Sequence, residues 1–407
     1  MSASGELTRL NHHLASARPS ATYGIIDRVA RRRAEGARII SLCAGEPDFD
    51  TPRHVRDAAM LAIDEGHTRY TQVAGSRALR EAVAAKFRSE NGLQVEWQDT
   101  LVCSGGKQVI YNALAATLNE ADEVIVPAPY WVSYPEMVQL CGARSVIVTC
   151  DASSGFKLTP RALAEAITPR TRWLILNSPS NPTGAVYGFD ELRALAAVLL
   201  ANPHVLVLAD DIYEHLIFDD QRFHTLVQVE PRLAERTLTM NGVSKAYAMT
   251  GWRIGFATGP RWLLAAMEKL QGQQTSGACS ISQQAAVAAL EGPKDFIQQS
   301  REVFQRRRDL MVKALEGIPG LQCERPAGAF YAFANCAALI GRTSPKGRYL
   351  RTDEDVALAL LDEADVAVVH GSAFGLGPYL RIAYALDDQS LVEACAAIER
   401  FCRAVMH

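Results

Sequence analysis

The sequence predicts an α/β fold with helices layered on a sheet, and three observations support this prediction. Short apolar segments rich in β-branched residues alternate with segments of helical periodicity through the middle of the chain. Several of the apolar segments are almost continuously hydrophobic, which is typical of strands buried on both faces of a parallel sheet. The chain has 407 residues, 48% of them hydrophobic, so it is long enough to bury a large core.

The main alternation of elements can be followed segment by segment. The apolar segments have the length and the β-branched content of strands, whereas the segments between them space their apolar residues as one face of a helix. We therefore expect strands at 101–103, 123–127, 144–149, 172–177, 204–210 and 236–241, with helices at 107–119 and 190–202.

The pattern changes after about residue 290. A long charged segment at 293–318 predicts a helix, and short strands are expected at 328–334, 366–371 and 379–385. This part indicates a second, smaller α+β domain. The β-rich segment 37–49 comes before the main alternation, so the first residues are expected to join that domain. The predicted division is 1–50 for an N-terminal arm and part of the small domain, 51–292 for the large domain, and 293–407 for the small domain.

The composition excludes several functional classes. The net charge is −3, so it predicts no bulk attraction to nucleic acid or to an anionic membrane. The nine cysteines show no CxxC pair, which favours a reducing compartment and a cytoplasmic location. No histidine pattern has metal-ligand spacing. No apolar run approaches the roughly 20 residues of a membrane span, and the first residues lack the apolar core of a secretory signal.

Polar residues follow the predicted strands at the end where ligands gather in open α/β sheets. Each one alone has an ordinary explanation, as a turn, a helix cap or a surface residue. Together they place an anion cradle, an amide, a carboxylate, a phenol and two cations at the same edge of one sheet. These residues are Ser104, Gly105, Gly106, Asn181, Asp210, Tyr213, Lys245 and Arg253.

This combination of groups describes the chemistry of one coenzyme. Uncharged neighbours surround Lys245, and burial there would depress its pKa, so that the neutral amine can form a Schiff base with an aldehyde. The two glycines at the start of a helix, together with Arg253, would hold a phosphate. Asp210 would keep a ring nitrogen protonated, while Asn181 and Tyr213 would hydrogen-bond a ring oxygen. An aldehyde, a phosphate and an aromatic nitrogen together describe pyridoxal 5'-phosphate.

Several motifs extend this reading to a family. The segments "NSPSNPTG", "ADDIYEHL", "SKAYAMTGWRIG" and "AGEPDFDTP" resemble those of the class I pyridoxal-phosphate-dependent aminotransferases of fold type I. The segments "YTQVAGSRALR", "SGGKQ", "PAPYWVSYPEM" and "VHGSAFGLGPYLRIAYA" resemble the bacterial aspartate and aspartate/prephenate aminotransferase branch. The resemblance runs from about Pro19 to Tyr384. It implies a large cofactor-binding domain with a mostly parallel seven-stranded sheet flanked by helices, and a smaller α+β domain.

The resemblance also implies roles for individual residues. Lys245 matches the Schiff-base lysine, and Trp131 matches the aromatic residue stacked on the coenzyme ring. Arg381 matches the arginine that grips the substrate α-carboxylate, and an arginine inside an apolar strand independently indicates an anionic ligand. Gly45 lies where the backbone approaches that carboxylate. The family forms homodimers with shared active sites, in which Tyr70 would reach the coenzyme phosphate of the partner subunit.

Further positions bear on the substrate, which the resemblance makes a small amino acid or 2-oxo acid. Lys107 matches a lysine that contacts the distal carboxylate of acidic substrates, and Ser20 and Thr22 match hydroxyls that assist it. Arg18 matches a basic residue associated with prephenate. The implied reaction transfers the amino group of aspartate to 2-oxoglutarate by a ping-pong mechanism through pyridoxamine phosphate, with prephenate as a second substrate.

Other functions remain open from the sequence. An aminotransferase for aromatic or other amino acids, or a fold type I lyase, would use the same lysine, aspartate and arginine. A pyridoxal-phosphate-sensing regulator would need an added DNA-binding domain. The chain also departs from the family pattern at one point. Gly242, three residues before Lys245, replaces a phosphate-binding serine of many relatives, so phosphate binding is expected to depend more on Arg253 and Ser104.

Overall fold

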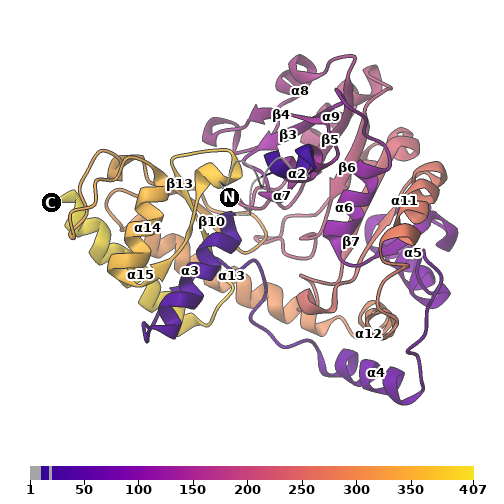
Figure 1. The fold of residues 1–407 in the computed structure, drawn as a ribbon, viewed down its shortest axis with the longest axis horizontal. Helices are drawn as coiled ribbons and strands as arrows, with labels where there is room; N and C mark the ends of the chain where they lie inside the picture. The colour runs from indigo at the N-terminus through magenta and orange to yellow at the C-terminus, as the bar shows by residue number, and fades with distance from the viewer. Residues whose placement is uncertain (1–10, 18–20) are drawn as a thin grey trace, which may run out of the picture.

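The computed structural model describes residues 11–17 and 21–407, which form two lobes (Figure 1). The larger lobe is built on a seven-stranded sheet with the order β2-β8-β7-β6-β5-β3-β4. Its strands are β2 (Thr100–Cys103), β3 (Glu123–Ala128), β4 (Arg144–Thr149), β5 (Thr171–Asn177), β6 (Leu206–Asp210), β7 (Thr237–Gly242) and β8 (Gly255–Thr258).

The sheet is mostly parallel, as predicted. Among its strands β8 runs antiparallel to both neighbours, while the β7-β6-β5-β3-β4 pairs are all parallel. The predicted strand 204–210 begins two residues later, at Leu206. The carboxyl ends of β5, β6 and β7 therefore meet at one edge of the sheet, where the sequence places its polar residues.

Helices cover both faces of this sheet, which explains the continuous apolar strands. On β3, Val124 and Val126 pack in the cluster with α6, α7 and α11, whereas Ile125 packs in the cluster with α8 and α9. These helices are α6 (Gly106–Ala115), α7 (Ser133–Leu140), α8 (Pro160–Ala166), α9 (Phe189–Ala201) and α11 (Arg261–Gln274). Three more helices pack in the same lobe and shield the β2–β8 end: α4 (Arg53–Asp64), α5 (Arg77–Asn91) and α12 (Ser280–Glu291).

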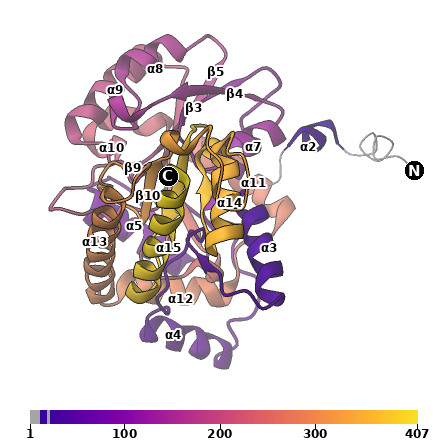
Figure 2. The same ribbon diagram turned by 90° about the vertical axis from the view of Figure 1, so that its left-hand side faces the viewer.

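The smaller lobe packs helices on a four-stranded sheet with the order β12-β13-β10-β9 (Figure 2). Its strands are β9 (Gln322–Cys323), β10 (Tyr331–Asn335), β12 (Val369–His370) and β13 (Tyr379–Ala383), and its helices are α13 (Asp295–Glu316), α14 (Asp353–Ala364) and α15 (Asp388–Met406). The prediction of a single strand at 366–371 is wrong. The structure has two short strands there, because β11 (Val366–Ala367) pairs with β1 in a separate two-stranded sheet, whereas β12 pairs with β13 after the chain changes partner at Val368.

The N-terminal segment lies against the smaller lobe. β1 (Ile40–Ser41) pairs with β11 in parallel, and α3 (Ala21–Ala34) lies beside α14, to which it is joined by an ion pair of 3.1 Å between Arg28 and Asp362 (Figure 1). The domain boundaries at residues 50 and 292 stay a prediction. No helix within residues 11–17 and 21–407 has both the length and the apolar character needed to cross a bilayer.

Candidate active site

Lys245 lies in the loop that follows β7, with its amino group enclosed between the lobes. Its Nζ donates a hydrogen bond of 2.6 Å to the carbonyl oxygen of Gly45. Burial, together with the charges of Arg253 and Arg381, lowers the pKa of the Lys245 amine from 10.5 to about 8, although the carboxylates of Glu46 and Asp210 oppose this shift. A substantial fraction of this amine is therefore neutral near pH 8, as a nucleophile requires.

Asp210 ends β6 and is almost completely buried. Its Oδ2 accepts a hydrogen bond of 2.5 Å from the hydroxyl of Tyr134, and its Oδ1 accepts one of 3.3 Å from the backbone N–H of Ile212. Burial raises the pKa of this carboxyl to about 6. The charge of Lys245 lowers this pKa, but no described cation lies within ion-pair distance of the carboxylate. A buried carboxylate without an ion-pair partner costs free energy, so a protonated ring nitrogen is a fitting partner for it.

The glycine-rich turn after β2 forms a cradle against Arg253. Gly105 has φ +89°, and a Cβ built there would lie 2.2 Å from Nη2 of Arg253, so only glycine lets the guanidinium approach this closely. A Cβ on Gly255 would lie 2.3 Å from the backbone nitrogen of Gly106, at the start of α6. In the same turn, the backbone N–H of Ser104 donates a hydrogen bond to the side-chain oxygen of Gln108. A helix N-terminus, close-packed glycines and a guanidinium fit a phosphate.

Arg381 on β13 is a buried cation without an acidic partner. Nη1 donates a hydrogen bond of 3.1 Å to Oδ1 of Asn181, and Nη2 donates one of 2.6 Å to the carbonyl oxygen of Cys43. Its Nε is buried and has no hydrogen-bond partner. No carboxylate of the described residues lies within ion-pair distance of this guanidinium. Since an uncompensated buried charge is costly, the geometry calls for an anionic ligand.

Aromatic side chains bound the space between these groups. The hydroxyl of Tyr213 lies 2.7 Å from that of Tyr331, and its ring centroid lies 5.9 Å from Nζ of Lys245. The indole of Trp131 packs edge-on against Tyr134, with ring centroids 5.4 Å apart. Lys107 places its Nζ 5.0 Å from the Trp131 ring centroid, and burial lowers the pKa of Lys107, with Arg253 lowering it further. The aromatic side chains therefore fit a planar ligand ring, and Lys107 provides a second cation beside that space, in addition to Arg381.

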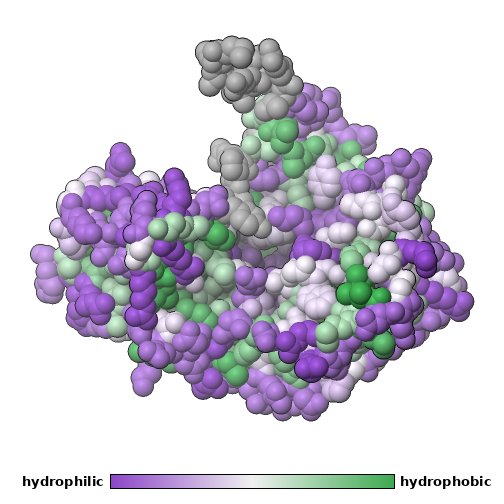
Figure 3. Space-filling view, turned by 60° about the horizontal axis from the view of Figure 1, so that its bottom comes forward, coloured by the Kyte–Doolittle hydropathy of each residue, from purple (hydrophilic) through white to green (hydrophobic). Residues whose placement is uncertain are grey.

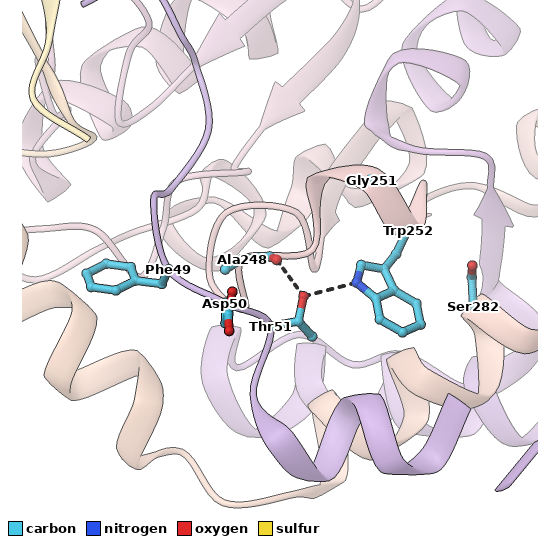
Figure 4. A pocket seen from close by; sticks show the side chains of 7 residues that line it. All are labelled: Phe49, Asp50, Thr51, Ala248, Gly251, Trp252 and Ser282. Atoms are coloured by element: carbon cyan, nitrogen blue, oxygen red, sulfur yellow. Dashed lines mark hydrogen bonds between the residues drawn. The ribbon is translucent and has the colours of Figure 1, made fainter. Parts of the chain in front are cut away.

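A hollow of about 420 Å³ is lined by Ala248, Gly251 and Trp252, which lie between Lys245 and Arg253 in the chain, and by the segment 49–51 and Ser282 (Figure 4). Thr51 bridges its wall: the hydroxyl donates to the carbonyl oxygen of Ala248 at 2.7 Å and accepts from the indole N–H of Trp252 at 3.0 Å. Neither Lys245 nor Arg253 lines this hollow. The two hydrogen bonds of Thr51 tie the loop between these residues to the segment that precedes α4.

The structure thus brings most of the predicted site residues together, and a few lie elsewhere. Tyr70 projects from the chain between α4 and α5 and is 93% exposed. Thr22 is half-buried in the first turn of α3. Arg18 and Ser20 lie outside the described residues, so their predicted roles stay predictions.

The glycine at position 242 has a local explanation. Gly242 is the last residue of β7, and a Cβ there would lie 3.0 Å from the carbonyl oxygen of Ile254 and 3.1 Å from Cδ1 of Ile212. A serine at this position would therefore require these neighbours to move. The expectation that phosphate binding depends on Arg253 and Ser104 stays a prediction.

The structure adds two residues that sequence reasoning missed. Tyr134, at the start of α7, holds Asp210, and Tyr331, on β10, holds Tyr213. The only sequence signal for Tyr134 is its spacing of three residues from Trp131, which lies just before α7 (Ser133–Leu140). Tyr331 had no such signal, because it comes from the smaller lobe.

Fold and site together define an enzyme that binds an aldehyde coenzyme carrying a phosphate and a basic ring nitrogen. Lys245, Asp210 and the Gly105–Arg253 cradle supply one suitable partner for each of these three groups. The buried carboxylate of Asp210 and the depressed pKa of Lys245 each fit this coenzyme better than they fit a purely structural role.

Comparison with known proteins agrees. The family model of aminotransferase class I and II matches residues 37–398. A probable aspartate/prephenate aminotransferase of Rhizobium leguminosarum bv. phaseoli is 56% identical over 391 residues, covering 96% of this chain and 98% of the relative. The crystal structure of the aspartate aminotransferase from Rhizobium meliloti superposes with a TM-score of 0.95 at 51% identity, covering 97% of this chain and 99% of that one. An aspartate aminotransferase from Thermus thermophilus with maleate gives 0.90 at 40% identity, covering 96% and 99%.

The chain therefore belongs to the class I and II aminotransferases. It is a transaminase that uses pyridoxal phosphate, and its fold is that of the aspartate aminotransferases, as the sequence predicted.

Proposed function

We propose that this enzyme transfers the amino group of aspartate to 2-oxoglutarate, and that prephenate is a second acceptor. The proposal rests on two cations in one site, Arg381 and Lys107, neither of which forms an ion pair with a described acidic residue. A dicarboxylic substrate supplies one carboxylate for each of them. The names of the similar proteins, and the dicarboxylate maleate in one solved structure, also support it.

The residues of the chain divide the work of this reaction. Arg381 would bind the α-carboxylate with two N–H donors. Lys245 would take the proton from Cα and pass it to the coenzyme carbon bonded to the same nitrogen, and it would carry the proton in the reverse direction in the second half-reaction. Asp210 holds a proton on the ring nitrogen of the coenzyme, and Tyr213 donates to the ring oxygen. Pyridoxal phosphate, when bound, supplies the electron sink for the pair left by the broken Cα–H bond. Trp131 covers the ring and keeps water away from the reacting carbon.

The substrate proposal is tested by a panel of amino donors with 2-oxoglutarate as acceptor. We expect aspartate to give the highest kcat/KM. We also expect Lys107→Ala to lower kcat/KM for aspartate about 10- to 100-fold, because it removes a hydrogen bond to a charged group, while leaving phenylalanine nearly unchanged.

Lys269→Ala on the exposed face of α11 is the matched control, since it also removes a helical lysine. An equal loss for aspartate and phenylalanine in Lys107→Ala would contradict the role of this residue. Release of ammonia or of a small fragment without any oxo-acid acceptor would instead favour a lyase.

We also propose that the enzyme is a homodimer in which Tyr70 completes the active site of the partner subunit. Tyr70 is 93% exposed, and α4, just before it, exposes Met60, Leu61 and Ile63 by half or more. Exposed apolar side chains on one helix are typical of an interface. The face turned forward in Figure 3, on the side of α4, is mostly hydrophilic with hydrophobic patches set into it. A cytoplasmic location stays a prediction.

A hybrid enzyme tests this arrangement. Sedimentation should give twice the chain mass of 44.4 kDa. Tyr70→Phe should weaken coenzyme binding about 10-fold through the loss of a charge-assisted hydrogen bond. In a dimer of one Tyr70→Phe chain and one Lys245→Ala chain, one site then has both native residues and should regain wild-type coenzyme affinity. If each chain supplied its own Tyr70, no hybrid site would recover.

A further inference from the structure

Tyr331 belongs to the smaller lobe and contacts three residues of the active site. It lies on β10, opposite Ala383 of β13, and its side chain is fully buried. Its hydroxyl lies 2.7 Å from the hydroxyl of Tyr213. A Cβ on Gly45 would lie 2.8 Å from the same hydroxyl, so the backbone of Gly45 packs directly against it. Its ring lies beneath the guanidinium of Arg381, with 4.7 Å between the ring centroid and Cζ.

The hydroxyls of Tyr213 and Tyr331 have two protons between them, which limits the hydrogen bonds that they can donate. Burial raises the pKa of Tyr213 and of Tyr331, so both hydroxyls keep their protons at neutral pH. One proton forms the hydrogen bond between them, and the other remains for a third group. The hydroxyl of Tyr331 is covered on its other side by Gly45, whereas Tyr213 lies beside Lys245. The geometry therefore leaves Tyr213 as the phenol that has a proton to donate into the site.

We propose that Tyr331 is a positioning residue for transamination: its hydroxyl donates to Tyr213 and directs the proton of Tyr213 toward the ring oxygen of the coenzyme. Its ring supports the guanidinium of Arg381 in the same place. This inference rests on the proposed roles of Tyr213 and Arg381. One side chain of the smaller lobe then orients both a donor to the coenzyme and the cation that binds the substrate carboxylate.

Tyr331→Phe separates these two contributions, because it removes the hydroxyl and keeps the ring beneath Arg381. The readout is the pH midpoint of the absorbance change of the bound coenzyme in the absence of substrate. A hydrogen bond donated to the ring oxygen stabilises the deprotonated form, so misdirecting it raises the midpoint. We expect Tyr331→Phe to raise the midpoint by about 0.4 to 1 pH unit, with a smaller change in KM than in kcat.

A double-mutant cycle shows whether Tyr331 acts through Tyr213. Tyr213→Phe should raise the midpoint more than Tyr331→Phe does, and adding Tyr331→Phe to it should produce no further shift. Tyr384→Phe is the control, since this second buried tyrosine of the smaller lobe donates to the carbonyl oxygen of Ala329 at 3.3 Å instead. It should leave the midpoint in place.

Three results would overturn the inference. The first is an unmoved midpoint in Tyr331→Phe. The second is a Tyr331→Phe shift that is equally large with and without the Tyr213 hydroxyl, and the third is an equal shift in Tyr384→Phe. Failure of the wild-type enzyme to transfer the amino group of aspartate would overturn the proposed function as well. A wild-type enzyme that transaminates normally, next to an unaltered Tyr331→Phe, would overturn this inference alone.

Discussion

Lys245→Ala should reduce kcat about 10³-fold or more, with the fold intact. The variant loses the amine that carries the coenzyme and the group that moves the proton at Cα, and a positioned proton-transfer group alone contributes on the order of 10²- to 10⁴-fold. Lys269→Ala should keep wild-type activity. Steady-state assays with aspartate and 2-oxoglutarate, together with borohydride reduction followed by mass spectrometry of the residue-245 peptide, measure both functions.

The same lysine provides a test that does not depend on turnover. Because its pKa is lowered to about 8, the Lys245 amine becomes neutral at lower pH than other lysines, whose usual pKa is roughly 10.4. In coenzyme-free enzyme, trace labelling of Lys245 by an acylating reagent should rise with pH and level off above a midpoint near 8. Labelling of Lys245 that levels off only above roughly pH 10, as for an ordinary lysine, would contradict the assigned role. A Lys245→Ala enzyme with a tenth of wild-type activity would contradict it as well.

Arg381→Lys should lower kcat/KM about 100-fold for aspartate and for phenylalanine alike. Lysine keeps the charge but loses the fork of donors that matches a carboxylate, and breaking a buried charged pair costs about 2 to 5 kcal/mol. The uniform loss distinguishes Arg381 from Lys107, whose removal should affect only dicarboxylic donors. The comparison therefore assigns one carboxylate to each cation.

Arg400→Lys, on the exposed surface of α15, is the control in the same lobe. The affinity for maleate, measured from the absorbance of the bound coenzyme, should fall in Arg381→Lys as kcat/KM does. If Arg381→Lys affected aspartate but spared phenylalanine, the guanidinium would bind the distal carboxylate, and the assignment of the two cations would have to be exchanged.

The layered fold could be predicted from the sequence because the hydrophobic pattern of each strand and helix lies within a few consecutive residues. A strand such as β3 is apolar on both faces because helices cover both faces, and this alone indicates the layered sheet. The error at 366–371 has a non-local cause. The apolar pattern continues through Val368, but the chain leaves one sheet for another there, and only the position of β1 shows this.

The site shows the same division between local and distant signals. Asp210 ends one predicted strand and Lys245 follows another, so both were expected at the same edge of one sheet. The contact of Tyr331 with Tyr213 depends on how the two lobes meet, and no spacing in a single sequence encodes that. Tyr70 was assigned from the family resemblance alone, and its exposure could not be read from the sequence. Tyr134 lies between these cases, because it is near Trp131 in the sequence, while its partner Asp210 ends β6, far away in the chain.

One short stretch of backbone holds both the cation assigned to the carboxylate and the amine assigned to the coenzyme. The carbonyl oxygen of Cys43 accepts from Arg381 and that of Gly45 accepts from Lys245, and these two residues are only two peptide steps apart, roughly 7 Å when extended. A shift of the backbone at residues 43–45 would therefore move the acceptors of the guanidinium and of the amine together, so the two groups are expected to be displaced as a pair.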